Sequence, residues 1–319
     1  MSQVNDVLTP ITQAMNEGAI TRRELKQLMT RSDKPALLRL ALWVPLVLAT
    51  GYLIALAMGS IWFVLAMMLH GVVLVHHFSL QHECCHYTAF KTRWLNDLVG
   101  NLCGLVIMLP NRFFRYEHCD HHTFTQRHGH DPEMIELPVN LRGYLWYLSS
   151  VPYWRAKFSE LYRHSAGHIT PAEKKFIPKE ERATIIREAR LMALFYFAVI
   201  VACIVQGWTA PLWYWLIPVI LGEPVMRAIR MTEHVGRPAV GDMRVNTRSN
   251  IVSAPWRFLC WNMNYHAEHH YASSVPFHAL PALSEKLGSH VYTEKKGYFG
   301  AHIDMLAQIL GRKPRAPSA

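Results

Sequence analysis

The sequence has few charged residues and few cysteines for its length. Aspartate, glutamate, lysine and arginine make up 18% of its 319 residues, and its six cysteines include no CxxC pair. Such spacing excludes a disulfide framework and a zinc ribbon, so we expect reduced cysteines. The opening residues, MSQVNDVLTPITQAMNEG, lack the lysines and apolar core of a secretory signal. We therefore expect no cleaved signal peptide.

The sequence contains long blocks of apolar residues. Hydrophobic residues make up 51% of the chain, and four blocks are long enough to cross a membrane: residues 37–58, 61–80, 191–208 and 211–226. The first two blocks are joined by a turn of a few residues, as are the last two, and neither turn contains Lys or Arg. We predict an all-α integral membrane protein with four transmembrane helices in two hairpins and a cytoplasmic helical cap.

The basic residues lie in the segments that flank these hairpins, and the net charge is +10. Anionic headgroups explain that charge more simply than nucleic acid, which we do not expect as a partner. Lys and Arg gather on the cytoplasmic side of membrane proteins. Both termini and the segments at 81–190 and 227–319 are therefore predicted to be cytoplasmic, in a membrane of the bacterial inner type.

The chain divides into three predicted regions. Residues 1–35 have a helical apolar pattern and form an amphipathic arm, which lies on the membrane or packs over the domain that follows. Residues 36–300 form the membrane domain, and residues 301–319 form a C-terminal helix and tail. Within the membrane domain, residues 97–110 are apolar but too short to cross, so we expect a buried or re-entrant helix there.

Eight of the nineteen histidines fall into three groups with helical spacing. Positions i, i+3 and i+4 of a helix share one face, so each group presents its rings together. One further histidine follows the fourth span at about the depth at which the first group follows the second span. The candidates are His82 and His86; His118, His121 and His122; His266, His269 and His270; and His234.

A metal site is the leading interpretation of these groups. Neutral imidazole binds iron, copper, zinc or nickel, and a single ion usually takes two to four protein ligands. Nine histidines fit a pair of ions with room for O2 or water. Glu83 and Glu268 lie inside the groups, and Asp131 adjoins His128 and His130, so the three carboxylates are candidates for hydrogen bonding to the ligands.

The ordered set HxxxH, HxxHH and HxxHH, with two pairs of apolar spans, resembles the membrane fatty acid desaturase family, whose superfamily also contains hydroxylases and carotenoid ketolases. The segments HECCHYTAFKTRWLND, HCDHHTFTQRHGHDPE and NMNYHAEHHYASSVPFHALP carry this resemblance, which covers about residues 37–300. It implies two iron ions bound by the nine histidines and the use of O2 to attack an unactivated C–H bond. It also places Asn262 near one metal.

The resemblance favours desaturation of a fatty acyl or related lipid chain. A hydroxylase or carotenoid-type ketolase on the same scaffold is the alternative enzyme. No fused cytochrome b5-type module is visible in the sequence, so we expect a separate ferredoxin, rubredoxin or cytochrome b5-like donor with its reductase. A membrane protein that transports or stores metal is the alternative outside enzymes. Its ligands would lie within the spans, whereas these are predicted beyond the span ends.

A few polar residues in or near the spans allow two interpretations. Arg227 and Arg230, near Glu223 and Glu233, are either charges that snorkel at a helix end or groups that recognise a substrate headgroup or carboxylate. The histidines at 70, 76 and 77 are better explained by polar packing inside the bundle or by contact with a substrate tunnel.

Overall fold

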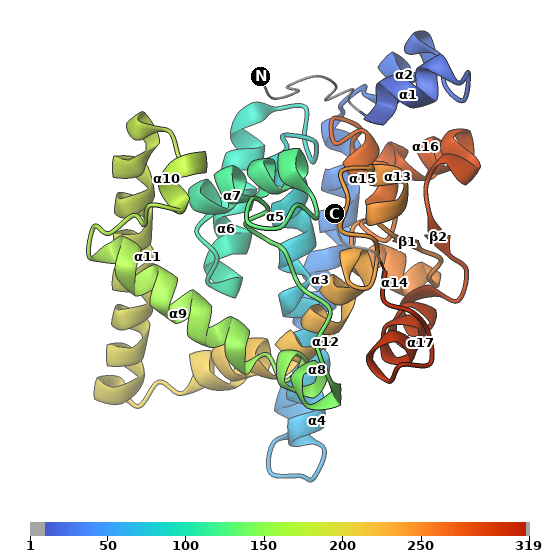
Figure 1. Ribbon diagram of the computed structural model, residues 1–319. Helices are drawn as coiled ribbons and strands as arrows, with labels where there is room; N and C mark the ends of the chain where they lie inside the picture. The colour runs from blue at the N-terminus through green and yellow to red at the C-terminus, as the bar shows by residue number, and fades with distance from the viewer. Residues whose placement is uncertain (1–9, 317–319) are drawn as a thin grey trace. The chain divides into compact units, whose positions relative to one another are not determined.

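The computed structural model describes residues 10–316, which are predominantly helical (Figure 1). Residues 1–9 of the predicted arm and 317–319 of the predicted tail lie outside the described part. The chain forms two compact units, each built from separate stretches of sequence. Among the described residues, unit 1 contains 10–31, 121–137 and 231–316, and unit 2 contains 32–120 and 138–230.

Unit 2 contains the long apolar helices. Its elements are α3 (Asp33–Ala57), α4 (Phe63–Val75), α5 (His77–Cys85), α6 (Arg93–Ile107), α8 (Leu141–Leu148), α9 (Val151–Ser165), α10 (Glu173–Phe176), η1 (Lys179–Glu181), α11 (Arg182–Gln206) and the π-helical turn η2 (Leu212–Leu216). Two further helices begin in unit 2 and end in unit 1: α7 (Asn111–Phe124) and α12 (Ile217–His234).

Among residues 10–316, four helices are long and apolar enough to cross a membrane, as the sequence predicts. They cover Asp33–Ala57, Phe63–Cys85, Lys179–Gln206 and Leu212–His234. Each overlaps one predicted span, but the second and fourth run on past the predicted ends at 80 and 226. His82 and His234 therefore lie on these helices rather than beyond them, because buried polar residues continue a helix where the apolar run has stopped.

Close packing between helices of unit 2 depends on two glycines. A Cβ atom on Gly71 of α4 would come within 2.0 Å of the Pro218 carbonyl oxygen, and one on Gly222 of α12 would come within 2.3 Å of the Gly71 backbone. Only glycine allows two backbones to approach so closely. The crossing brings α12 against α4, whose continuation α5 carries His82.

The other histidines of these helices have hydrogen-bond partners inside the bundle, as the packing interpretation predicts. His70 is buried, with Nδ1 2.8 Å from the Thr50 hydroxyl and Nε2 3.0 Å from the Tyr214 carbonyl oxygen. His76 and His77 place their Nδ1 atoms against backbone carbonyls one turn earlier. The predicted short helix at 97–110 is α6, which ends at Met108 in a left-handed conformation. It is only partly buried, because Leu98 and Leu102 face outward.

Unit 1 contains short helices around a parallel pair of two-residue strands. Its own elements are α1 (Pro10–Asn16), α2 (Arg22–Leu28), α13 (Met243–Asn246), β1 (Ser249–Asn250), α14 (Ala254–Leu259), α15 (His266–Tyr271), η3 (Phe277–Ala279), α16 (Leu280–Leu287), η4 (Gly288–His290), β2 (Thr293–Glu294) and α17 (Gly297–Ile309). In the strand register Ser249 faces Thr293.

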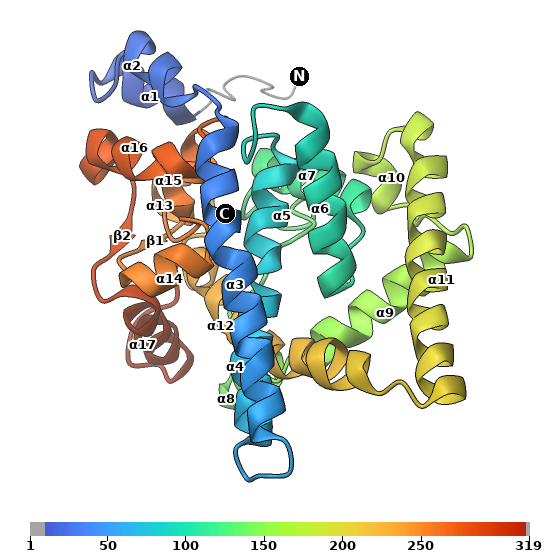
Figure 2. The ribbon, with the colours of Figure 1, turned by 180° about the vertical axis from the view of Figure 1, so that it is seen from behind.

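The N-terminal arm packs within unit 1, where α1 and α2 lie beside α16 in both views (Figures 1 and 2). Ala14 and Ile20 are buried in one apolar cluster with Ala267, Tyr271 and other residues of α15 and α16. Thr21 starts α2 with a capping box to Glu24. The described part of the arm therefore packs over the helix that carries the third histidine group, which is the second of the two predicted placements.

Candidate metal centre

Four histidines of unit 1 converge on one point. His121 comes from α7, His234 from the end of α12, and His266 and His270 from α15. Their candidate ligand atoms all lie within 4.8 Å of one another, and all four side chains are buried. His266 Nε2 lies 2.9 Å from His234 Nε2 and 3.1 Å from His270 Nε2. We call these residues the four-histidine cluster.

Polar partners on the outer side of the cluster determine which nitrogen of two rings carries hydrogen. His121 Nδ1 lies 2.8 Å from Asp131 Oδ1, and His234 Nδ1 lies 3.4 Å from the Asn246 carbonyl oxygen. A carboxylate and a carbonyl can only accept, so both Nδ1 atoms are assigned as donors. Each Nε2 then presents a lone pair to the centre, the usual arrangement of a metal-binding histidine.

A hydroxyl gives the same result for His270. The Thr125 hydroxyl donates to the His121 carbonyl oxygen at 2.7 Å, and its oxygen lies 3.2 Å from His270 Nδ1. Because its single hydrogen is already used, Thr125 accepts from Nδ1 of His270. Burial, with smaller effects from the neighbouring histidines, lowers the pKa of His270 well below its usual value. The ring is therefore neutral and its Nε2 faces inward with a lone pair.

This arrangement fits a cation. Nitrogen lone pairs about 3 Å apart repel each other unless a positive charge lies between them. Around one ion with metal–nitrogen distances of about 2.1 Å, adjacent ligand nitrogens lie about 3 Å apart. The Nε2 separations of 2.9 and 3.1 Å match that geometry. Iron is among the metals that imidazole ligands suit.

A carboxylate that the sequence analysis did not assign to the site lies beside the cluster. Glu233 Oε2 is 3.7 Å from His266 Nε2, the nitrogen that faces the other rings. The Glu233 side chain is buried, although it had appeared only as part of a polar run near the interface. Its position immediately before His234 was the available signal. The carboxylate supplies negative charge where a bound cation would need it.

Three histidines of unit 2 form a second group, which we call the three-histidine cluster. His82 lies on α5, His86 follows the end of that helix, and His118 lies on α7. Their candidate ligand atoms are within 4.8 Å of one another. The His118 ring centroid is 4.3 Å from that of His82 and 5.0 Å from that of His86. Phe114 stacks on His118 at 5.2 Å, so one side of this cluster is apolar.

The last two candidate ligands form a pair in unit 1. His122 Nε2 lies 3.0 Å from His269 Nε2, and the His122 ring stacks on His270 with centroids 4.1 Å apart. His122 follows His118 by four residues on the unbroken helix α7. Residues at that spacing are neighbours on one helix face.

The other predicted carboxylates and the predicted amide have different contacts from Asp131. Glu268 accepts hydrogen bonds from the hydroxyls of Ser249 and Ser284, and its burial raises its pKa. Glu83 accepts from the Thr88 hydroxyl at 2.8 Å. Asn262 has a positive φ of 62° and donates to the Phe277 carbonyl oxygen at 2.9 Å. These contacts hold the backbone near the histidines.

Both candidate headgroup residues are buried, so the snorkelling interpretation is wrong. Arg227 Nε donates to Glu223 Oε1 at 2.6 Å, and its guanidinium lies over the Tyr153 ring. The Arg230 guanidinium lies 5.0 Å from the Phe78 ring centroid. A charge buried this way is held by partners inside the protein instead of reaching to the interface. Whether either arginine meets a substrate stays a prediction. His128 and His130, by contrast, are exposed.

Comparison with known proteins gives a consistent result. The family model described as fatty acid desaturase matches residues 60–301. The sn-1 oleoyl-lipid 12-desaturase of Anabaena variabilis is 22% identical over 270 residues, which cover 73% of this chain and 72% of the relative. The chloroplastic omega-6 fatty acid desaturase of Arabidopsis thaliana is 24% identical over 272 residues, which cover 76% of this chain and 58% of the relative. The sn-1 acyl-lipid omega-3 desaturase (ferredoxin) of Nostoc sp. (strain 36) is 24% identical over 43% of this chain and 40% of the relative.

Proposed function

Because this chain belongs to the fatty acid desaturase family, and is thus an oxidoreductase of that type, we propose that it introduces a double bond into the acyl chain of a membrane lipid. The observation that carries this proposal is the convergence of the four-histidine cluster, with inward lone pairs and an adjacent carboxylate. Bound iron would supply the reduction of O2 that removes two hydrogens from adjacent methylenes, consuming two electrons and two protons and yielding two waters.

The proposed ligands are the nine histidines predicted from the sequence. The four-histidine cluster would hold one ion. The three-histidine cluster would contribute to the second, with His122 and His269 as its further ligands, since His118 and His122 share a face of α7. Asp131 keeps the hydrogen of His121 on Nδ1, and Thr125 does the same for His270. These residues keep the inward nitrogens free to bind metal.

The membrane topology and the predicted domain division remain proposals. We place the four long helices across a membrane as two hairpins, with both termini and the histidine clusters on the cytoplasmic side, because Lys and Arg are absent from the turns at 59–60 and 208–210. Residues 1–35, 36–300 and 301–319 would form the arm, the membrane domain and the C-terminal helix and tail. A bacterial-type inner membrane is the proposed location.

The proposed electron donor is a separate protein. The name of the relative from Nostoc sp. (strain 36) includes the word ferredoxin, and this chain carries a net charge of +10. A basic surface favours association with an acidic carrier, and such association weakens as salt increases. The charge fits any acidic carrier, so the preference for ferredoxin over rubredoxin or a cytochrome b5-like protein rests on the relative's name alone.

The test combines metal content with product mass. Protein purified in detergent is expected to contain two irons per chain by elemental mass spectrometry. Lipids from an expressing host are expected to contain an acyl chain lighter by two hydrogens. A product heavier by one oxygen would assign the chain to hydroxylation or ketolation. Bound metal without any altered lipid, when a donor and reductase are supplied, would favour metal transport or storage.

A further inference from the structure

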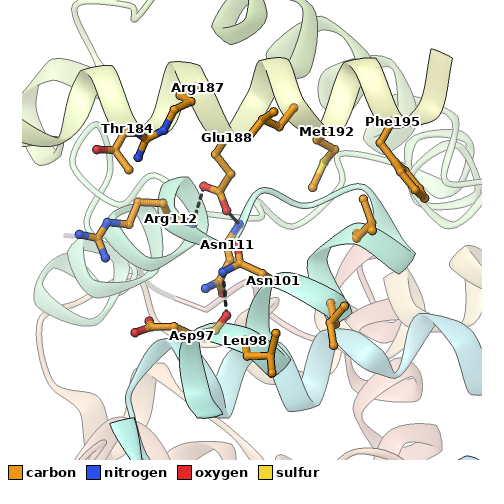
Figure 3. Close-up of a pocket in the computed structure, with 13 residues that line it drawn as sticks. Asp97, Leu98, Asn101, Asn111, Arg112, Thr184, Arg187, Glu188, Met192 and Phe195 are labelled. Atoms are coloured by element: carbon orange, nitrogen blue, oxygen red, sulfur yellow. Dashed lines mark hydrogen bonds between the residues drawn. The ribbon is translucent and has the colours of Figure 1, made fainter. Parts of the chain in front are cut away.

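We infer that unit 2 holds one phospholipid of the surrounding bilayer in a groove between α11 and the α6–α7 region, apart from the metal centre's histidines. The groove has a volume of about 530 Å³. Figure 3 shows α11 on one side and the helices that carry Asp97 and Asn111 on the other. This inference needs only that α11 crosses a membrane, and it does not depend on desaturation.

One end of the groove is polar and has groups available to a ligand. Asn111 is 4% exposed, and its side-chain oxygen has no hydrogen-bond partner among residues 10–316. Arg187 lies at the rim, exposed, and the described residues provide it with no ion pair. Arg112, in contrast, is held by two hydrogen bonds to Glu181. Arg187 is therefore the guanidinium that remains for a bound phosphate.

A neighbouring carboxylate is already committed to the protein. Glu188 accepts from the backbone N–H groups of Asn111 and Arg112, both at 2.9 Å, and so caps the start of α7 (Figure 3). Its charge is balanced by these donors at a helix N-terminus. Glu188 lines the groove, but its two oxygens are already bonded to these backbone N–H groups, and Asp97, the other carboxylate of the lining, is paired with Arg115 at 3.1 Å. Arg187 is therefore left to accept an anion.

The remainder of the groove is apolar and follows α11 toward the membrane centre. Its lining includes Leu98 and Leu102 from α6 and Leu191, Met192 and Phe195 from α11. From residue 184 to residue 195 the helix rises about 16 Å. That length matches one leaflet, which is half of a hydrocarbon core of about 30 Å. Only 22% of the most apolar part of this helix is buried, so lipid chains would surround it.

The chemistry of the two ends selects the occupant. Arg187 lies near the start of α11, and the apolar part of the groove beyond it is about as long as one leaflet is thick. This order matches a lipid phosphate followed by its acyl chain. Arginine suits phosphate because its planar donors bind two oxygens at once. A second protein helix would cover the apolar wall but would leave Arg187 without an anion.

Native mass spectrometry in a mild detergent, with phosphatidylglycerol added, tests the site. Leu191→Trp, which projects a larger side chain into the groove, is expected to remove a retained lipid. Leu194→Trp is the matched control, because Leu194 is 62% exposed against 61% for Leu191, on the same helix, and does not line the groove. Arg187→Gln should lower lipid retention about fivefold, and Lys179→Gln should leave it unchanged.

Three results would overturn the inference. The first is equal lipid retention by the Leu191→Trp and Leu194→Trp variants. The second is a change of oligomeric mass in Leu191→Trp with no lipid bound to the wild type, which would assign the groove to a protein partner. The third is exchange of the retained phospholipid with desaturated product during turnover, which would make the groove a substrate site and the assignment to a resident bilayer lipid wrong.

Discussion

Replacing Asp131 by asparagine tests the proposed metal centre at a residue that does not itself bind metal. The Asp131 carboxylate accepts from His121 Nδ1 at 2.8 Å, from the Gln126 backbone N–H at 2.8 Å and from the Glu133 backbone N–H at 2.9 Å. An asparagine oxygen can keep the first and third of these bonds. Its NH2 group would then face the Gln126 N–H, so two donors oppose each other.

The expected loss follows from these contacts. His121 would lose a charged acceptor, and its ring would be less firmly oriented. Loss of such an outer partner typically lowers metal affinity about 10–100-fold, or about 1.4–2.7 kcal/mol. We expect Asp131→Asn near the lower end of that range and Asp131→Ala, which removes all three acceptors, near the upper end.

Iron retention against a graded chelator, measured by elemental mass spectrometry, gives the affinity. Asp242→Asn is the control, because Asp242 is a carboxylate of the same unit that binds Arg244 and, among residues 10–316, hydrogen-bonds to none of the nine histidines. Thermal unfolding of each variant separates loss of metal from loss of fold. Unchanged iron affinity in Asp131→Ala, in a folded protein, would refute the role of Asp131 in holding His121.

Three further results are expected. His269→Ala should reduce desaturation to background while the protein still inserts and purifies; substantial turnover would contradict its role as a ligand. Glu233→Gln, which keeps the shape of the side chain but removes its charge, should weaken iron binding about tenfold. Glu285→Gln, at an exposed position, is the control and should leave iron binding unchanged. Equal iron content in the two variants would exclude an electrostatic contribution from Glu233. Gly71→Ala should lower the melting temperature, because its Cβ would lie 2.0 Å from a backbone oxygen. Gly51→Ala is the control and should not lower it, because its Cβ would lie 3.6 Å from the nearest atom. Equal melting temperatures of the two variants would contradict the helix crossing.

The long helices could be predicted from the sequence because lipid contact requires uninterrupted apolar residues. Their ends could not, because burial of polar side chains decides where they stop. The second long helix continues through Gln81 and Glu83 to Cys85, and Gln81 Nε2 donates to the Leu109 carbonyl oxygen at 2.8 Å. A hydropathy pattern contains no information about such a partner 28 residues away.

The histidines could be predicted as candidate metal ligands and Asp131 as a partner of one of them, but the other outer partners could not. Thr125 and Asn246 are common residue types in loops and helix ends, and nothing in their local sequence distinguishes them from other polar residues. Asn246 contacts the site only through its backbone oxygen, which every residue has. Glu233 was visible as a charge, yet its direction toward His266 depends on how α12 and α15 pack within unit 1.

The two HxxHH motifs have a physical reason to end in adjacent histidines. Neighbouring residues of a helix project about 100° apart, so the rings of a His-His pair cannot serve the same position. On α7, His121 joins the four-histidine cluster while His122 pairs with His269. On α15, His270 joins the four-histidine cluster while His269 faces His122. Each motif therefore divides its ligands between two places, which a single ion would not require, and this division favours a pair of ions over one.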